Sequence, residues 1–292
     1  MLKKNLLFIV GAFVFFISCS SDYEKRLKIS ATTWVGYTPL FYAKEKGWLQ
    51  PLNIKLVHLS SLAENMYLYS AGNSDAYVGT QYEYEVLSKE MDSLIPIMMF
   101  DKSNGGDVVM SNFSIEELQS TLAPINIYLE IDSINSKLIK DFLSKYNLLE
   151  KKINYINEDQ TTIKLLKSNE KATLIVTYLP YNFLLEKNGF KEIASTKESV
   201  DLLIVDAMFT KVEVYNEHKQ QFRELKKLMN KSVEALNKDP REFYNTVKPY
   251  MLDISYEEFV DTLNDIVWIN QGMSNELKNR LNTTGFPTRD LI

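Results

Sequence analysis

Short apolar runs alternate with helical patterns between Leu27 and Val205, and this alternation limits the fold more than any other feature of the sequence. Strands separated by helices indicate βαβ units and mainly parallel sheets flanked by helices. We interpret the apolar runs as strands over Leu27–Ala31, Ile54–Leu59, Ala76–Val78, Ile95–Phe100, Val108–Met110, Ile125–Leu129, Lys152–Tyr155, Thr173–Thr177 and Leu202–Val205. Helical patterns cover Pro39–Lys46, Leu62–Ser70, Glu83–Met91, Ile134–Tyr146, Thr161–Lys167 and Tyr181–Lys187. Beyond about Val212 the pattern becomes purely helical, over Tyr215–Asn237, Pro240–Pro249, Ser255–Ile269 and Ser274–Asn282.

The middle of the chain holds enough strands and helices for a lobe of its own. No internal repeat or Gly/Ser-rich linker separates it, but Gly105 and Gly106 are paired glycines, which absorb large backbone changes between lobes. We therefore predict two α/β lobes. Lobe I comprises residues 27–105 and 206–292, and lobe II comprises residues 106–205.

The first residues have the pattern of a targeting segment. Lys3 and Lys4 precede the apolar run Leu6–Ile17, which is shorter than the roughly 20 residues of a membrane span but normal for a signal peptide. The run ends before Ser18-Cys19, which resembles the lipobox of bacterial lipoproteins. We expect a signal peptide over residues 1–18, lipidation at Cys19 and a tether over 19–26. The alternative is an ordinary signal peptide with an incidental cysteine.

Composition narrows the possible partners. Cys19 is the only cysteine, so the exported part has no disulfide and no thiol site. The net charge is −5 and no basic cluster occurs, which argues against nucleic acid as a partner. We expect a monomer in the cell envelope, on the periplasmic or extracellular face, anchored to a membrane by the lipid on Cys19.

Four loops at predicted strand ends are richer in polar and aromatic side chains than a connection needs. They are the loop of Trp34, Gly36 and Tyr37, and the segments Gly79–Glu83, Asp101–Asp107 and Glu130–Ser133. In open α/β sheets, ligands bind beyond the carboxyl ends of the strands. Aromatic faces with a few fixed polar groups are what a small-molecule pocket needs. The loops therefore predict a binding site for a small molecule.

Some of these loops lie in a longer series of motifs that resembles one family. The opening W-x-G-Y-x-P-L pattern and its K-G helix end match Trp34, Gly36, Tyr37, Pro39, Leu40, Lys46 and Gly47. An A-G-x-x-D-A pattern matches Ala71, Gly72, Asp75 and Ala76, and a D-x-S-x-G-x-D pattern matches Asp101, Ser103, Gly105 and Asp107. In order and spacing they resemble the substrate-binding proteins of the nitrate/sulfonate/taurine ABC transporters, which include thiamine-precursor binders. Where many members have Trp-Glu-Pro, this chain has Tyr178-Leu179-Pro180.

The resemblance implies a two-lobed periplasmic-binding-protein fold of type II, which closes over a ligand and delivers it to an ABC permease. The ligand-binding residues that we predict are Trp34, Tyr37, Thr80, Gln81, Glu83, Ser103, Asn104, Asp107, Glu130, Ser133, Tyr178 and Asp206.

Several of these residues have a structural alternative. Trp34 can wedge between the lobes, and Thr80 with Glu83 forms a capping box for the following helix. Asp101 and Asp107 can fix turn amides around the paired glycines, and Asp206 can brace the hinge.

The charges of the four loops favour one ligand class. Glu83, Asp101, Asp107, Glu130 and Asp132 stand against a single base, Lys102. Sulfonate or nitrate pockets need donors and usually Arg or Lys, whereas carboxylates beside aromatic rings suit an amine or a nitrogen heterocycle. We predict a cationic or nitrogen-heterocyclic ligand, such as a thiamine-precursor pyrimidine. A sulfonate, taurine or nitrate binder is the alternative ligand class.

The sequence gives little support for an enzymatic function. His58 and His218 are far apart in the sequence and lack metal-ligand spacing, and no P-loop, dinucleotide fingerprint or nucleophile elbow occurs. We expect no enzymatic activity, no cofactor and no metal. The alternative function is a sensory lipoprotein whose closing lobes report to a membrane kinase or cyclase.

Overall fold

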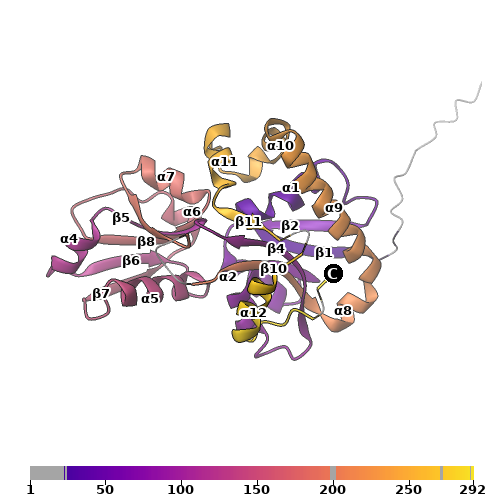
Figure 1. The fold of residues 1–292 in the computed structure, drawn as a ribbon, viewed down its shortest axis with the longest axis horizontal. Helices are drawn as coiled ribbons and strands as arrows, with labels where there is room; N and C mark the ends of the chain where they lie inside the picture. Colours follow the sequence, from indigo (N-terminus) through magenta and orange to yellow (C-terminus); the bar gives the residue numbers. More distant parts are fainter. Residues whose placement is uncertain (1–22, 24, 198–201, 270–271, 290) are drawn as a thin grey trace, which may run out of the picture.

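Two β-sheets lie side by side along the long axis of the computed structural model, each flanked by helices (Figure 1). The structure describes residues 23, 25–197, 202–269, 272–289 and 291–292. The predicted signal peptide and Cys19 lie outside these residues. We use lobe I and lobe II for the parts built on the first and the second sheet.

The first sheet has six strands in the order β11-β4-β10-β3-β1-β2. Its strands are β1 (Leu27–Thr32), β2 (Ile54–Leu59), β3 (Ala76–Thr80), β4 (Leu94–Ser103), β10 (Val205–Lys211) and β11 (Ile266–Trp268). The helices of this lobe are η1 (Val35–Tyr37), α1 (Thr38–Glu45), α2 (Leu62–Ser70), α3 (Gln81–Leu87), α8 (Val212–Glu217), α9 (Lys219–Lys238), α10 (Pro240–Val247), η2 (Lys248–Tyr250), α11 (Tyr256–Thr262) and α12 (Asn275–Thr283).

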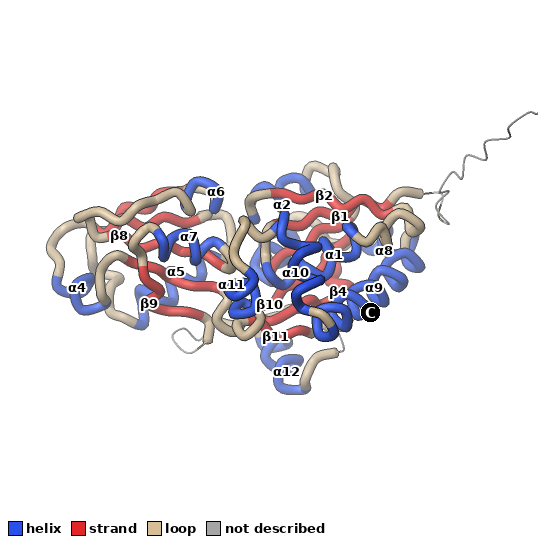
Figure 2. The backbone as a smooth tube through the Cα atoms, turned by 90° about the horizontal axis from the view of Figure 1, so that it is seen from above, coloured by secondary structure: helices blue, strands red, loops and turns tan. Residues whose placement is uncertain are grey.

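The second sheet has five strands in the order β7-β6-β8-β5-β9. They are β5 (Asp107–Ser111), β6 (Ile125–Leu129), β7 (Ile153–Asn157), β8 (Thr173–Tyr178) and β9 (Lys191–Ser195). Its helices are α4 (Ile115–Ser120), α5 (Asn135–Lys145), α6 (Gln160–Ile163) and α7 (Tyr181–Lys187), and Figure 2 shows them beside the second sheet.

The α/β fold with two sheets confirms the predicted fold class, but the expectation of mainly parallel sheets is wrong. In the first sheet β1 pairs in parallel with β2 and β3, whereas β10 is antiparallel to both β3 and β4. In the second sheet β5 is antiparallel to β8 and β9. The cause is the route of the chain. β5 and β10 each enter their sheet from the other lobe, not through a crossover helix within it.

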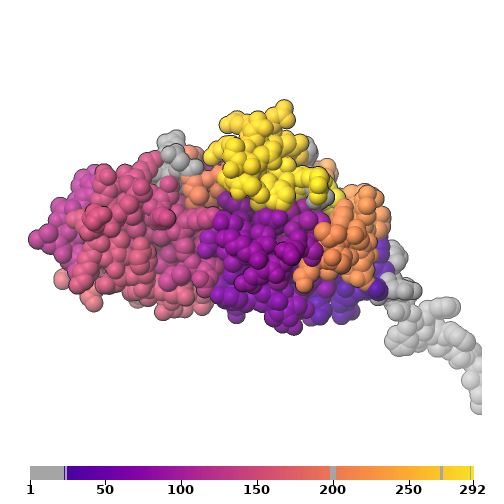
Figure 3. Space-filling model, turned by 90° about the horizontal axis from the view of Figure 1, so that it is seen from below, coloured from indigo at the N-terminus to yellow at the C-terminus, as the bar shows by residue number. Residues whose placement is uncertain are grey.

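The C-terminal part is helical with one exception. Residues 266–268 form β11, which pairs with the end of β4, so the predicted helix over Ser255–Ile269 is wrong in its second half. A three-residue strand at a sheet edge is too short for a period to reveal it. The last residues pack onto the early part of the chain, and on the face seen from below the two lobes meet directly (Figure 3).

One buried core lies mainly in lobe I and extends across the cleft to Ile134 and Tyr178, a second core lies within lobe II, and two connections join the lobes. Leu27, Phe41 and Phe243 belong to the core of lobe I, and Ile127 and Phe142 to that of lobe II. One connection runs from the end of β4 through residues 104–106 to β5, and the other leads from β9 to β10. Gly105 has a φ of +128°, which favours glycine, so the first connection needs a glycine at this point.

Candidate functional site

A small cavity lies between the two lobes. Its lining comes from both: Thr32, Trp34, Tyr37, Leu62, Thr80 and Asp206 from lobe I, and Asp107, Ile134 and Tyr178 from lobe II. The free volume is about 10 Å³, roughly the space that one water molecule needs. The cleft between the lobes is therefore closed in this structure.

Trp34 connects the two walls of the cleft. It follows β1 with an extended backbone, and its Nε1 donates to both oxygens of Asp101, at 3.2 and 3.3 Å. Its ring meets the ring of Tyr178 edge to face, with centroids 6.0 Å apart. A Cβ on Gly106 would come within 2.3 Å of the Trp34 ring, so the backbone of the first connection lies directly against this side chain.

Asp206 occupies the floor of the cavity on β10. The strand register places it beside Thr80 of β3 on one side and beside Asp101 of β4 on the other. The hydroxyl of Tyr37 donates a hydrogen bond to its carboxylate. Burial and the neighbouring Asp101 raise the pKa of Asp206 well above its ordinary value.

Glu83 is buried and joins the lobes. Thr80 caps α3, and the Glu83 carboxylate accepts the Thr80 amide at 2.8 Å and the Thr80 hydroxyl at 2.5 Å, which confirms the predicted capping box. Its other oxygen accepts the amide of Ile134, in lobe II, at 3.1 Å. Burial raises the pKa of Glu83, and these hydrogen bonds oppose the rise.

Lobe II contributes two further acids. Asp107 is the first residue of β5, and burial raises its pKa to about 7. Glu130 follows β6, and burial raises its pKa to about 8 although Ser61 and the Leu62 amide approach it. Neither Glu130 oxygen completes a hydrogen bond within the described chain, and the same is true of the Tyr178 hydroxyl. These buried groups lack the partners that buried polar atoms normally have.

Charge of one sign gathers at this site. Among the described residues, the buried acids are Glu83, Asp101, Asp107, Glu130 and Asp206, and no lysine or arginine is buried. The pKa of each of these acids is raised, with burial as the largest cause. Buried charges are costly unless they are paired. The arrangement can therefore hold a positively charged or proton-donating group between aromatic rings.

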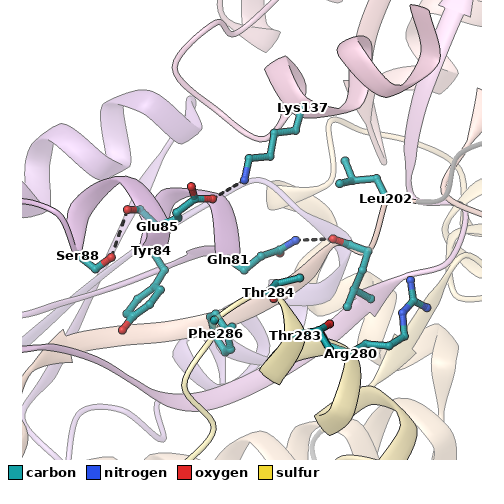
Figure 4. Close-up of a pocket in the computed structure, with 12 residues that line it drawn as sticks. Gln81, Tyr84, Glu85, Ser88, Lys137, Leu202, Arg280, Thr283, Thr284 and Phe286 are labelled. Carbon is teal, nitrogen blue, oxygen red and sulfur yellow. Dashed lines mark hydrogen bonds and ion pairs between the residues drawn. The ribbon is translucent and has the colours of Figure 1, made fainter. Parts of the chain in front are cut away.

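Gln81 points away from this cavity, into a groove between α3, α5 and α12 (Figure 4). Its amide nitrogen donates to the Leu203 carbonyl, and its oxygen accepts the Val205 amide at 2.9 Å. Both contacts hold the second connection between the lobes. At the upper side of the groove, Glu85 of α3 pairs with Lys137 of α5.

Three other predicted contacts hold the backbone near the cleft. The Ser103 hydroxyl is 2.7 Å from the Thr196 hydroxyl and accepts the Asp107 amide at 3.1 Å. The Asn104 amide donates to the Asp265 carbonyl at 2.9 Å. The Ser133 hydroxyl donates to the Glu130 carbonyl at 2.8 Å and accepts the amide of the second residue after it at 3.2 Å. As ligand contacts, Gln81, Ser103, Asn104 and Ser133 stay predictions.

The sequence reasoning missed three residues of the lining: Thr32, Leu62 and Ile134. Thr32 is buried at the end of β1, and its hydroxyl has no hydrogen-bond partner in the described chain. Its position, directly before the aromatic loop, was the available signal.

The two histidines lie apart from the acids. His58 Nε2 is 2.9 Å from the Thr33 hydroxyl, and His218 Nδ1 is 2.6 Å from Gln221. Within the described ranges no group of three or more His, Cys, Asp or Glu side chains has the geometry to hold a metal ion. The same ranges contain no helix that is both long and apolar enough to cross a bilayer.

The fold is that of the periplasmic binding proteins, and the structural neighbours include a ligand-binding component of an ABC-type import system, an alkanesulfonate-binding protein and a nitrate-binding protein. The ligand-binding component of an import system from Staphylococcus aureus, solved with zinc bound, is 14% identical with a TM-score of 0.71, covering 89% of this chain and 90% of its own. The alkanesulfonate-binding protein of Xanthomonas axonopodis pv. citri is 11% identical with a TM-score of 0.70, covering 91% and 98%.

The periplasmic nitrate-binding protein of Synechocystis is 12% identical with a TM-score of 0.62, covering 81% of this chain and 69% of its own. No protein-family model matches the sequence, and no curated protein matches it. At these identities the likeness establishes the fold, and the ligand has to be argued from the site itself.

Proposed function

We propose that this chain is a lipid-anchored, extracytoplasmic solute-binding protein that closes around a cationic or nitrogen-heterocyclic ligand and delivers it to an ABC permease. The observation that carries the proposal is the group of buried acids at the interlobe cleft, which includes Asp107 and Asp206, while no lysine or arginine is buried among the described residues. A cation between them would supply the charge that the site lacks.

The aromatic side chains support the same ligand class. Trp34 and Tyr178 meet across the cleft, and Tyr37 lies in the same lining. Aromatic faces attract cations and stack on flat heterocycles. A thiamine-precursor pyrimidine carries an amino group on such a ring, and is the example that we favour.

Sulfonate or nitrate is the competing ligand class, because two of the neighbours are described as binding them. The charges oppose it. An anion in this cavity would lie against the Asp107 and Asp206 side chains and would raise their pKa values further, whereas a cation would lower these pKa values and pair with the ionised carboxylates.

The test has two stages. Mass spectrometry of small molecules released on denaturing the purified protein identifies what the closed lobes retain. Calorimetry then measures the aminopyrimidine thiamine precursor and putrescine against taurine, methanesulfonate and nitrate. We expect binding in the first group and none in the second. Tight binding of methanesulfonate or nitrate alone would overturn the ligand class. Unchanged uptake of the bound compound in cells that lack this chain would overturn the transport role.

A further inference from the structure

The N-terminus of helix α5 faces the cleft from lobe II. The first backbone amides of a helix lack partners within the helix and carry partial positive charge, so this is where a protein commonly holds an anion. Here each of the first amides already has a partner. Ile134 donates to Glu83 at 3.1 Å, Asn135 to the Ser133 hydroxyl at 3.2 Å and Ser136 to the Ser133 carbonyl at 3.1 Å.

The partner of Ile134 comes from the opposite lobe. Glu83 is 1% exposed, and its second oxygen is held by both the amide and the hydroxyl of Thr80. These two hydrogen bonds fix the carboxylate on its own helix, α3. The side chain therefore has a set position from which closing of the lobes brings it onto the Ile134 amide.

We propose that Glu83 determines the charge of the ligand, because on closing it fills the anion position at the N-terminus of α5 with a carboxylate of the protein itself. An anionic group of a ligand then finds no free amide there, and the carboxylates that remain unpaired around the cavity call for a cation. The inference rests on the proposed function and adds to it the residue that excludes anions.

The unpaired groups around the cavity agree with this assignment. Ile134 and Thr80 both line the cavity, so the Glu83 contact lies at its wall. The buried oxygens of Glu130 and the hydroxyls of Thr32 and Tyr178 have no hydrogen-bond partner in the described chain. A nearby cation favours the ionised form of Glu130, whose oxygens only accept, while the hydroxyls can donate or accept, so a donor-rich cation satisfies this set better than an anion does.

Glu85 provides a matched control. It lies two residues beyond Glu83 on the same helix and also reaches α5, through its ion pair with Lys137. The pair is half exposed, with side-chain exposures of 50% for Glu85 and 42% for Lys137. Replacing Glu85 removes the same charge from the same seam between the lobes without touching the cavity.

The experiment measures methanesulfonate and the aminopyrimidine thiamine precursor by calorimetry on wild type, Glu83→Ala, Glu83→Gln and Glu85→Gln. We expect Glu83→Ala to bind methanesulfonate at least tenfold more tightly than the weakest affinity that calorimetry can detect for wild type, Glu83→Gln to gain less, and Glu85→Gln to gain nothing. Thermal unfolding identifies the variants that fold. Glu83→Gln keeps an oxygen for the Thr80 cap and so remains usable if Glu83→Ala does not fold.

The inference is overturned if folded Glu83 variants bind methanesulfonate no better than wild type, or if Glu85→Gln gains as much as they do. Failure of the proposed function gives a different result. In that case the wild-type protein binds neither the aminopyrimidine nor putrescine, whatever the Glu83 variants do with methanesulfonate.

Discussion

Tyr37 and Asp206 are 169 positions apart in the sequence, and the Tyr37 hydroxyl donates directly to the Asp206 carboxylate. The bond joins the aromatic loop after β1 to the strand on which the chain returns from the second sheet. Asp206 lies between Thr80 and Asp101 on neighbouring strands, so three polar residues form a row, and two of them, Thr80 and Asp206, line the cavity. A ligand that contacts this row also contacts the start of β10.

The first prediction concerns Asp206. Asp206→Asn keeps the shape and removes the charge, so a cationic ligand loses one charge-assisted hydrogen bond, about 1.5–3 kcal/mol. We expect calorimetry to show a loss in affinity of roughly 10- to 100-fold. Asp92→Asn is the control, because Asp92 is an exposed acid of the same lobe. Equal affinities for the two variants would remove Asp206 from the site.

The second prediction concerns the contact between Gly106 and Trp34. A Cβ at Gly106 would meet the Trp34 ring at 2.3 Å, a distance that packed atoms do not adopt. Gly106→Ala should therefore keep the lobes apart and lower ligand affinity at least tenfold, with little change in the thermal unfolding of the ligand-free protein. Small-angle scattering measures the separation of the lobes.

A double-mutant cycle checks the cause of that effect. In a Trp34→Ala background the added methyl group has no ring to meet, so Gly106→Ala should cost little further affinity. If the two substitutions are additive, the glycine matters for a reason other than this contact.

The third prediction concerns pH. Burial raises the pKa of Asp107 from 3.8 to about 7 and that of Glu130 from 4.5 to about 8. Between the ordinary and the raised pKa values, Asp107 and Glu130 bind protons in the closed form but not in the open form, where water surrounds them. Burying these two carboxyl groups on closing without a ligand therefore costs no free energy below about pH 4, where both are protonated in either form. The cost reaches its full value above about pH 8, where both are ionised. We expect the ligand-free protein to be more compact at pH 5 than at pH 8 in small-angle scattering.

The same protons compete with a cationic ligand. Affinity for an amine whose own charge is constant over this range should fall as the pH drops from 8 to 5.5, and binding should release protons. Calorimetry in buffers of different ionisation enthalpy measures that release. Glu130→Gln should flatten the profile, and a ligand affinity that rises on acidification would contradict the assignment.

The fourth prediction separates Gln81 from the ligand contacts. Gln81→Leu removes the hydrogen bonds to the Leu203 carbonyl and the Val205 amide, and leaving a buried amide unpaired costs about 1–3 kcal/mol. We expect a lower unfolding temperature and an unchanged ratio of affinities between two bound compounds. Gln119→Leu, which breaks one exposed bond to the Tyr146 carbonyl, should change neither. A change in the ratio would make Gln81 a ligand contact.

Much of the fold was predictable because the periodicity of apolar residues along the sequence indicates where a strand lies. Ile54–Leu59 and Ile125–Leu129 were predicted with the bounds that the structure has. Direction was not predictable, since the period is the same whichever way a strand runs. The strand predicted over Leu202–Val205 is also misplaced: the structure has β10 over Val205–Lys211, antiparallel to both of its neighbours.

At the site, contacts between residues that are close in the sequence were predictable, and contacts between residues that are far apart were not. The capping box of Thr80 and Glu83 was predictable because its partners are three residues apart. The bond from the Ile134 amide to Glu83 was not, because its partners are 51 positions apart and lie on different lobes. Asp101 was interpreted as a turn residue, whereas its carboxylate accepts the Trp34 indole, a contact across 67 positions.

The register of β4 and β10 has a consequence for how such a molecule could be built or taken apart. The two strands are antiparallel neighbours in the first sheet, and Lys102 lies opposite Val205. Those are the points at which the chain leaves the first sheet and comes back to it. The whole second lobe is thus an insertion at the tip of a β-hairpin. A short turn in its place would leave the strand order of the first sheet unchanged, and would give a one-lobed protein that presents half of the cavity to solvent.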